Sequence, residues 1–307
     1  MTGSNSKHSR RDVHGVVLVD KPEGRTSNDV LQAVKRLYHA KKGGHTGALD
    51  PFATGLLPIC LGEATKFSSF LLEAKKAYIA TLTLGQATNS GDKLGEVTQT
   101  QAVPALTTEK VVGVLNQFLG TTLQTPPMYS ALKYQGRPLY AYAREGIEVE
   151  RTPREITLDA ITLKQCTDHQ LVFEVVCSKG TYIRTLGEDI AQRLGTVGHL
   201  TALHRTQSGD LKGTQMASIE AIAKAPEAHL RPLDTAIVHL PVLHLNETQA
   251  HSIMHGGKLA LDTETPPLVR LYDDQQFLGI GEWQTEKACL KPKRLIHPVF
   301  LKPAASV

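Results

Sequence analysis

The sequence contains few cysteines, few aromatic residues and no long apolar run. The four cysteines (Cys60, Cys166, Cys177 and Cys289) lie far apart and form no C-x-x-C pair. This pattern predicts neither a disulfide framework nor a zinc site, and it favours reduced thiols in a cytoplasmic protein. No stretch of about 18 uncharged apolar residues is present, so no transmembrane helix is expected. The N-terminus is polar and basic through Asp12, unlike a secretory signal peptide.

Motifs for common cofactors are also missing. The sequence has no G-x-x-x-x-G-K-[ST] phosphate loop, no G-x-G-x-x-G dinucleotide loop and no H-E-x-x-H zinc motif. His251 and His255 stand four residues apart, but no third ligand lies near them in sequence, so a surface or capping role is predicted. We therefore expect no nucleotide, no other cofactor and no metal.

Charge and length leave the function open. The chain has 307 residues, with 34 Lys and Arg against 30 Asp and Glu, and its net charge of +4 permits an anionic partner without requiring one. A chain of this length usually divides into two domains, because single cores stop growing near this size. Nothing in the pattern asks for more than a monomer.

Hydrophobic periodicity predicts alternating strands and helices up to about residue 240. After a flexible leader at 1–14, a buried strand at 15–19 leads to a helix with Ser27 as its N-cap. Further strands are expected at 56–61, 77–84, 171–177 and 199–206, and further helices at 64–72, 108–119 and 183–194.

A sparse apolar pattern with prolines places a boundary near residue 240, so we predict domains at 15–240 and 241–307. The second domain is a small β-rich unit. Its expected elements are a helix capped by Asn246 and strands at 268–272, 277–280 and 295–300.

Residues 121–154 differ in composition from their surroundings. Prolines and Gly136 break regular structure there, and the segment holds four of the eight tyrosines of the chain, with basic residues between them. Aromatic rings stack on bases and basic side chains contact phosphates, so the mixture favours nucleic-acid binding. The alternative is a partly buried helix with its tyrosines toward the core. The tyrosines are Tyr129, Tyr134, Tyr140 and Tyr142, and the basic residues are Lys133, Arg137, Arg144, Arg151 and Arg154.

The glycine-rich segment 44–55 contains one carboxylate, Asp50, followed by Pro51. Three glycines and one proline within these twelve residues exclude a continuous helix or strand, so a shaped loop is predicted. The proline favours an extended backbone at Asp50, which can hold the side chain out from the strand behind it. The local pattern alone favours a helix start, with Asp50 as N-cap and Pro51 in the first turn.

The whole segment 44–57, GHTGALDPFATGLL, resembles the catalytic segment of the TruB family of tRNA pseudouridine synthases. The same family's other motifs are matched, in order, by DKPEG at 20–24, KAY at 76–78, MYSALKYQG at 128–136 and SKGTYIRT at 178–185. The resemblance is dense over residues 14–206 and looser beyond, where the C-terminal unit is similar to a PUA-like RNA-binding domain.

The resemblance implies isomerisation of uridine to pseudouridine at the T-loop (TΨC arm) position numbered 55 in tRNA. The bond from ribose to N1 of uracil breaks, the base turns, and C5 bonds to the same ribose carbon, which consumes no cofactor. By this similarity Asp50 is the catalytic aspartate and Arg184 its cationic partner. Tyr78 matches the tyrosine that stacks on the uracil and assists loss of the C5 proton. Taken alone, Arg184 is typical of a solvated helix and Tyr78 of a core.

The resemblance also implies base flipping, because the target base is stacked within a folded RNA arm. His45 matches the residue that stacks where the flipped base lay. Tyr182 and Leu203 match positions that line the uracil pocket, although packing alone would also account for all three residues.

The remaining residues assigned to substrate binding are Lys21 and Lys133. Lys21 and Pro22 match a motif that closes the strand under the catalytic loop. Lys133 belongs to the segment 121–154, which resembles the insertion that grips the T-arm of tRNA. One departure is His204 before Arg205, where bacterial members typically have two arginines; it puts a phosphate contact in doubt.

The implied fold is α/β (α+β), with a mixed, largely antiparallel sheet in the catalytic domain and a β-rich PUA-like domain after it. Two other functions fit part of the pattern. A tRNA-binding folding chaperone, with catalysis secondary, would need the basic and aromatic insertion but not Asp50 or Tyr78. A hydrolase that cuts the glycosidic bond with Asp50 as nucleophile would release free uracil. Three roles are open to the carboxylate: attack on the ribose carbon, attack on C6, or removal of a ribose proton.

Overall fold

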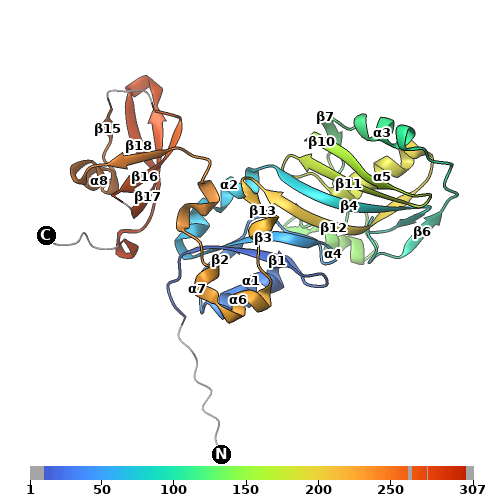
Figure 1. The fold of residues 1–307 in the computed structure, drawn as a ribbon, viewed down its shortest axis with the longest axis horizontal. Helices are drawn as coiled ribbons and strands as arrows, with labels where there is room; N and C mark the ends of the chain where they lie inside the picture. Colours follow the sequence, from blue (N-terminus) through green and yellow to red (C-terminus); the bar gives the residue numbers. More distant parts are fainter. Residues whose placement is uncertain (1–9, 262–264, 275, 302–307) are drawn as a thin grey trace, which may run out of the picture.

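The computed structural model describes residues 10–261, 265–274 and 276–301. Within them, a nine-stranded sheet and a five-stranded sheet form two lobes that lie side by side (Figure 1). No helix in this part of the chain is long and apolar enough to cross a membrane. No three His, Cys, Asp or Glu side chains gather into a metal-binding group among these described residues.

The large sheet has the strand order β1-β3-β12-β4-β11-β10-β7, with β2 on β3 and β13 on β12. Its pairs are antiparallel except for β12 beside β3, which confirms the predicted mixed, largely antiparallel sheet. The strands are β1 (Gly15–Lys21), β2 (Gly43–His45), β3 (Thr54–Leu61), β4 (Lys76–Leu84), β7 (Gly120–Gln124), β10 (Arg154–Cys166), β11 (Gln170–Cys177), β12 (Gly198–Ser208) and β13 (Leu211–Lys212).

Helices cover the sheet at both ends. They are α1 (Ser27–Leu37), α2 (Ser68–Glu73), α3 (Thr108–Asn116), α5 (Ile183–Leu194), α6 (Ile219–Lys224) and α7 (Pro226–His229), with 3-10 turns η1 (Gly62–Phe67), η2 (Gly213–Gln215) and η3 (Leu233–Ile237). A separate hairpin, β5 (Gln86–Thr88) with β6 (Val97–Thr100), lies beyond β4. Gly195 ends α5 in the left-handed conformation, as predicted.

Strand β1 shows why its sequence is apolar throughout. Val17 and Val19 face one core, shared with α1 and α5, while Val16 and Leu18 face a second core that contains Phe67. Side chains alternate across a strand, so a strand covered on both faces has no polar face.

Two predicted elements are wrong in detail, and one strand was missed. Thr26, not Ser27, caps α1, because its hydroxyl accepts from the Asp29 N–H while the Asp29 carboxylate accepts from the Thr26 N–H. The helix expected at 64–72 is split into η1 and α2. The strand β10 was not predicted, because a bulge between Leu158 and Ala160 interrupts its alternation.

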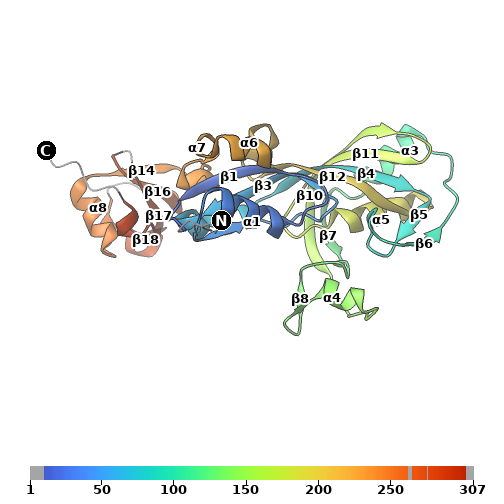
Figure 2. The ribbon, with the colours of Figure 1, turned by 90° about the horizontal axis from the view of Figure 1, so that it is seen from below.

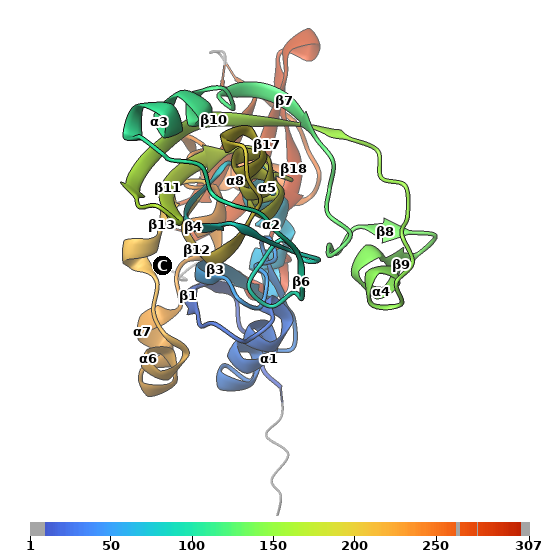
Figure 3. The same ribbon diagram turned by 90° about the vertical axis from the view of Figure 1, so that its right-hand side faces the viewer.

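Residues 125–153 project from the body of the large domain as a separate arm (Figures 2 and 3). The first residues of the predicted insertion, 121–124, instead belong to the edge strand β7, and Arg154 starts β10. The arm contains β8 (Lys133–Tyr134), β9 (Arg137–Pro138) and α4 (Leu139–Arg144).

The small domain has the strand order β14-β16-β17-β18-β15. Its elements are β14 (Val242–Leu245), α8 (Glu247–Met254), β15 (Leu259–Ala260), β16 (Leu268–Asp273), β17 (Gln276–Gln284), η4 (Thr285–Lys287), β18 (Cys289–Leu295) and η5 (Pro298–Phe300). Asn246 caps α8 as predicted.

The strand expected at 295–300 is wrong. The last strand is β18, and Pro298 starts a 3-10 turn instead. Pro292 is tolerated inside β18 because the neighbouring strand β15 pairs only with residues 289 and 290.

The two lobes share a core. Phe67 of the large domain meets Phe277 of the small domain edge to face, with ring centroids 5.3 Å apart. Beside them, Asp234 accepts hydrogen bonds from Arg270 and Tyr272, both at 2.6 Å. The domains are therefore packed against each other rather than joined by a free linker.

Of the predicted leader, residues 1–9 lie outside the described part of the chain. Residues 10–14 pack against the large domain, where Arg11 N–H donates to the His39 carbonyl at 2.7 Å and Asp12 pairs with Lys41 at 2.7 Å.

Candidate active site

The glycine-rich segment forms a loop between β2 and β3, and Lys21 holds it from below. The Lys21 side chain is fully buried. Its Nζ donates to the carbonyls of Pro51 at 3.3 Å and Ala53 at 2.6 Å, and to that of Pro22 at 3.0 Å. Burial lowers the pKa of Lys21 to about 8, against the opposing charge of Asp50.

Gly55 is required where this loop enters β3. Its φ is +96°, and a Cβ there would lie 2.5 Å from the Arg205 carbonyl oxygen on the neighbouring strand. Asp50 does not start a helix; the Ala53 N–H donates to its carbonyl in a turn at 3.1 Å. The structure therefore shows the predicted shaped loop at Asp50 and Pro51 rather than a helix start.

Asp50 and Arg184, which are 134 residues apart, form an ion pair. Arg184 Nε lies 2.9 Å from Asp50 Oδ2, and Arg184 Nη2 donates to Oδ1 at 3.1 Å, so the guanidinium holds both oxygens. The Arg184 side chain is 3% exposed and that of Asp50 is 35% exposed. Burial raises the pKa of the Asp50 carboxyl, and the charge and hydrogen bond of Arg184 oppose this rise.

Arg184 is fixed by three further groups. Its Nη1 donates to the Ser90 carbonyl and its Nη2 to the Tyr129 carbonyl, both at 2.7 Å. Its Nη1 also lies 3.7 Å from Asp92 Oδ2. The arginine thus joins the loop that carries Asp50, the loop after β5 and the start of the projecting arm.

A cavity of about 320 Å³ opens beside this ion pair. Asp50, Tyr78, Tyr182, Arg184 and Leu203 all line it, so the fold brings together five of the predicted residues from four separate segments. Further lining comes from residues such as Leu49, Lys76, Ser130, Thr181 and Arg205. Apolar side chains, basic groups and one carboxylate line the cavity together, a mixture that suits the binding of a flat ring with polar edges.

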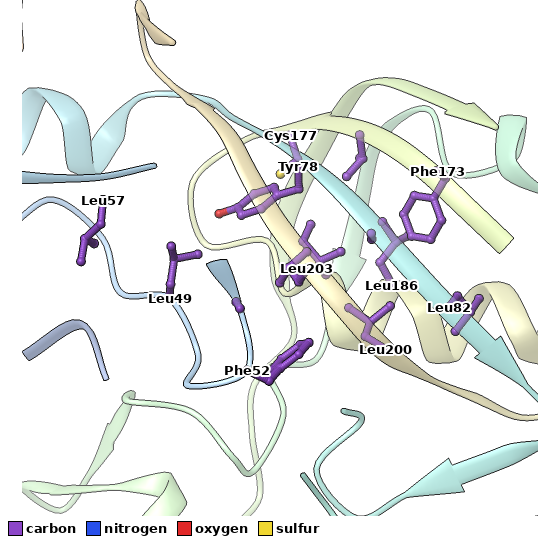
Figure 4. Close-up of a cluster of buried hydrophobic side chains, with 14 of the residues drawn as sticks. Leu49, Phe52, Leu57, Tyr78, Leu82, Phe173, Cys177, Leu186, Leu200 and Leu203 are labelled. Carbon is purple, nitrogen blue, oxygen red and sulfur yellow. The ribbon is translucent and has the colours of Figure 1, made fainter. Parts of the chain in front are cut away.

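Tyr78 stands at the edge of the core. In Figure 4 its oxygen points away from Phe173 and Leu82, toward the side where Leu49 lies. Burial raises the pKa of the Tyr78 phenol, and the nearby charge of Arg205 opposes this rise. The phenol is consequently protonated at neutral pH.

Arg205 is the important residue that sequence reasoning passed over. It pairs with Tyr78 across β12 and β4, and its side chain is 1% exposed. Its guanidinium donates to the carbonyls of Leu56 at 2.7 Å and Gly47 at 3.1 Å. The available signal was an arginine two residues after Leu203 in a predicted strand. His204 beside it is bonded to Thr54 at 2.9 Å. Asp92 gave no local signal, since it lies in a polar turn.

Three predicted residues lie outside the cavity lining. His45 is half-buried on β2, and burial and Arg205 lower its pKa, so its ring is neutral at pH 7. Lys133 is exposed on the projecting arm. Lys21 is absent from the cavity lining, and its Nζ donates to the carbonyls described above, which makes it a support of the loop.

Three protein families match consecutive segments of this chain. The family described as "TruB family pseudouridylate synthase (N terminal domain)" matches residues 35–183. Two C-terminal families match the remainder: "tRNA pseudouridylate synthase B C-terminal domain" at residues 184–238 and "Pseudouridine synthase II TruB, C-terminal" at residues 241–296.

Curated relatives align over nearly the whole chain. The tRNA pseudouridine synthase B of Hydrogenovibrio crunogenus is 57% identical and covers 95% of this chain and 97% of its own length. Those of Marinomonas sp. (47%, covering 94% and 96%) and Neisseria meningitidis serogroup B (45%, covering 96% and 98%) are similar over comparable spans.

Solved structures share the fold at lower identity. A Cbf5-Nop10-Gar1 complex matches with a TM-score of 0.72 and 23% identity, covering 93% of this chain and 85% of that chain. An H/ACA RNP bound to a substrate RNA containing 2'-deoxyuridine matches with a TM-score of 0.71 and 21% identity, covering 93% and 86%. These likenesses confirm the α/β fold with its C-terminal β domain. With three family matches in chain order and relatives at up to 57% identity, the chain belongs to the TruB family of pseudouridine synthases.

Proposed function

We propose that this protein isomerises the uridine at position 55, in the T-loop of tRNA, to pseudouridine, with Asp50 as the catalytic residue. Membership of the TruB family makes the chain a pseudouridine synthase, which is an isomerase. The relatives named tRNA pseudouridine synthase B support tRNA as the substrate. The T-loop position and the residue roles rest on the motif resemblance together with the geometry of the cavity.

The observation that carries the proposal is a single carboxylate, held by a buried arginine, at the wall of a cavity. Arg184 binds both oxygens of Asp50, so it orients the carboxylate and opposes the rise in pKa that burial causes. The Asp50 side chain is 35% exposed, so it can reach a bound nucleotide. An ionised, fixed carboxylate serves each of the three roles open to it.

The reaction balances without an added reactant. The C1'–N1 bond breaks, the uracil turns within the cavity, and the C1'–C5 bond forms. C5 then loses its proton to solvent, and N1 gains one. The net change is an exchange of one C–N for one C–C bond at constant mass.

For the cavity walls we propose the following roles. The Tyr78 ring stacks on the uracil; its raised pKa makes the neutral phenol a poor base unless the charge of Arg205 assists it. Tyr182 and Leu203 close the pocket around the base. His45, neutral and outside the cavity, occupies the place in the RNA that the flipped base leaves.

The arm at 125–153 is proposed to bind the T-arm. Tyr134 and Tyr140 are 43% and 40% exposed. Arg137 lies over the Tyr142 ring at 4.8 Å and Arg144 over the Tyr140 ring at 5.3 Å, so aromatic faces and positive charge stand together. This arrangement is not the core helix that the sequence left as an alternative. We further propose that the protein acts as a monomer in the cytoplasm.

Tritium release from tRNA labelled at C5 of uridine tests the proposal. The parent protein is expected to release one equivalent of tritium from a tRNA with uridine at position 55 and none when that base is cytidine. The change Asp50→Asn should abolish release, because an amide cannot supply the charge. The matched control Asp168→Asn changes an exposed carboxylate at the turn between β10 and β11 and should release tritium normally.

The same assay separates the other functions. No release by the parent protein would refute the isomerase. Normal release by Asp50→Asn would refute the assigned residue while leaving the activity standing. Free uracil among the products would indicate the hydrolase. A tRNA-folding effect that persists in Asp50→Asn would support the chaperone function.

A further inference from the structure

The start of helix α5 holds two residues that line the cavity, Tyr182 and Arg184, yet the N-cap side chain makes no hydrogen bond to the first turn. Tyr182 is the N-cap residue and makes no side-chain hydrogen bond to the first turn. Arg184 is the second residue of the helix. The positions of the Tyr182 ring and the Arg184 guanidinium therefore depend on what holds this helix end.

Gln124 holds it from another part of the fold. Its Nε2 donates to the Tyr182 carbonyl at 3.0 Å, and its Oε1 accepts from the Tyr182 N–H at 2.8 Å. The same carbonyl accepts the first helical hydrogen bond, from the Leu186 N–H at 3.0 Å. The Gln124 amide thus bonds both the N–H and the carbonyl of Tyr182, as a neighbouring strand would, at the residue where α5 begins.

The burial of Gln124 is unusual for its strand. The other residues of β7 are exposed, and Gln124 alone points inward, at 5% exposed. A buried amide must satisfy both its donor and its acceptor, and here one residue's backbone satisfies both. Of the uncharged side chains, only an amide on a chain of this length offers a donor and an acceptor at that spacing.

Gln124 also stands where the projecting arm begins. It is opposite Arg154, the residue at the arm's return, in the β7–β10 register. Five residues further along, the Tyr129 carbonyl accepts from Arg184 Nη2. The base of the arm therefore touches the start of α5 twice, once through the Tyr182 backbone and once through Arg184.

We propose that Gln124 is a positioning residue of the active site: it fixes the first turn of α5 so that Tyr182 and Arg184 face Asp50. This inference rests on the proposed function for its catalytic consequence. It predicts an effect on the chemical step, since a displacement of about 1 Å at a catalytic group can cost about 100-fold in rate. It predicts little effect on RNA affinity, because Gln124 contacts no exposed surface of the arm.

The test compares Gln124→Met with the control Gln117→Met. Gln117 accepts from Arg193 at 2.7 Å, so the control removes a glutamine contact from the opposite end of the same helix. In single-turnover tritium release at saturating tRNA, Gln124→Met is expected to be about 10- to 100-fold slower, with the dissociation constant for tRNA changed by less than about threefold. The acid limb of its rate profile should move to higher pH, because a loosened Arg184 no longer opposes the raised pKa of Asp50. Gln117→Met should match the parent in all three measurements.

A second readout does not depend on activity. Amide hydrogen exchange at Tyr182 and in the first turn of α5 should be faster in Gln124→Met and unchanged in Gln117→Met.

The inference is overturned if Gln124→Met reacts at the parental rate with an unshifted pH profile. It is also overturned if Gln117→Met is slowed equally, since α5 would then be sensitive to any loosening. Should the parent protein release no tritium, the proposed function fails on its own, and the exchange measurement still decides whether Gln124 holds the helix start.

Discussion

At the scale of single residues, the proposed active site depends on the balance of charges around Asp50. Asp50 is buried enough for its pKa to rise, Arg184 lowers that pKa, and Asp92 raises it from the far side of Arg184. The carboxylate must be ionised to act in any of its three proposed roles. The rate should therefore fall as pH falls through the raised pKa of Asp50, and each neighbour sets where this occurs.

Two substitutions are expected to move the acid limb in opposite directions. Arg184→Gln removes the charge that lowers the Asp50 pKa, so the limb should shift to higher pH, with a slower plateau. Asp92→Asn removes the charge that raises it and keeps the Oδ1 atom that accepts from the Leu94 N–H, so the limb should shift to lower pH. Single-turnover tritium release across the acid range measures both; shifts of the same sign would contradict this balance.

At the scale of elements, the projecting arm stands apart from the cavity. Tyr134 on β8 and Tyr140 on α4 are exposed, as is Lys133, whereas most residues that line the cavity belong to the large domain outside the arm. The base of the arm reaches the site, through the Tyr129 carbonyl and the cavity-lining residues Ser130 and Ala131. Substitutions at the tip should therefore change affinity for RNA and leave the chemical step intact.

Tyr134→Ala is expected to weaken tRNA binding about 10-fold, the loss of one base stacked on a ring. Lys133→Ala should lower the slope of log affinity against log salt by about 1, the loss of one phosphate contact. Filter binding at several salt concentrations measures both effects. Lys164→Ala, which removes an exposed lysine of β10 paired with Glu174, is the control and should change neither. A slower single turnover at saturating tRNA in Tyr134→Ala would show that the tip takes part in chemistry.

At the scale of the whole molecule, the two domains share a polar contact as well as an apolar core. Asp234 lies in the large domain, 5% exposed, and its carboxylate accepts from Arg270 and Tyr272 of the small domain. A buried carboxylate that loses its cation is costly, because the remaining charge stays desolvated.

Arg270→Met is expected to lower the free energy of unfolding by about 3 kcal/mol, the usual cost of leaving a buried charge unpaired. It should also expose the segment near residue 240 to limited proteolysis, since the small domain loses its Arg270 contact with Asp234. Lys291→Met breaks an exposed pair with Glu282 and should cost less than about 1 kcal/mol. Denaturant unfolding measures the free energy of unfolding of both variants. If both lose the same small amount, the apolar core alone joins the domains.

Local patterns were enough to predict much of this molecule. Strands β1, β3, β4, β11 and β12, helix α5 with its Gly195 end, and the Asn246 cap all follow from short-range periodicity and capping chemistry. Strand β10 did not, because a bulge shifts its alternation, and neither did the true end of β18, where a charged, proline-containing strand resembles a loop.

The sequence by itself determined the motif chemistry: one carboxylate in a glycine-rich loop, a tyrosine and an arginine in matched segments, and a basic, aromatic arm. Only the tertiary structure decided that Arg184 holds both oxygens of Asp50, that Arg205 is buried beside Tyr78, and that Gln124 holds the start of α5. The reason is physical. Residue type and spacing encode local backbone preference and burial, but a contact between residues 58 or 134 positions apart depends on strand order and register, which arise only when the whole chain packs.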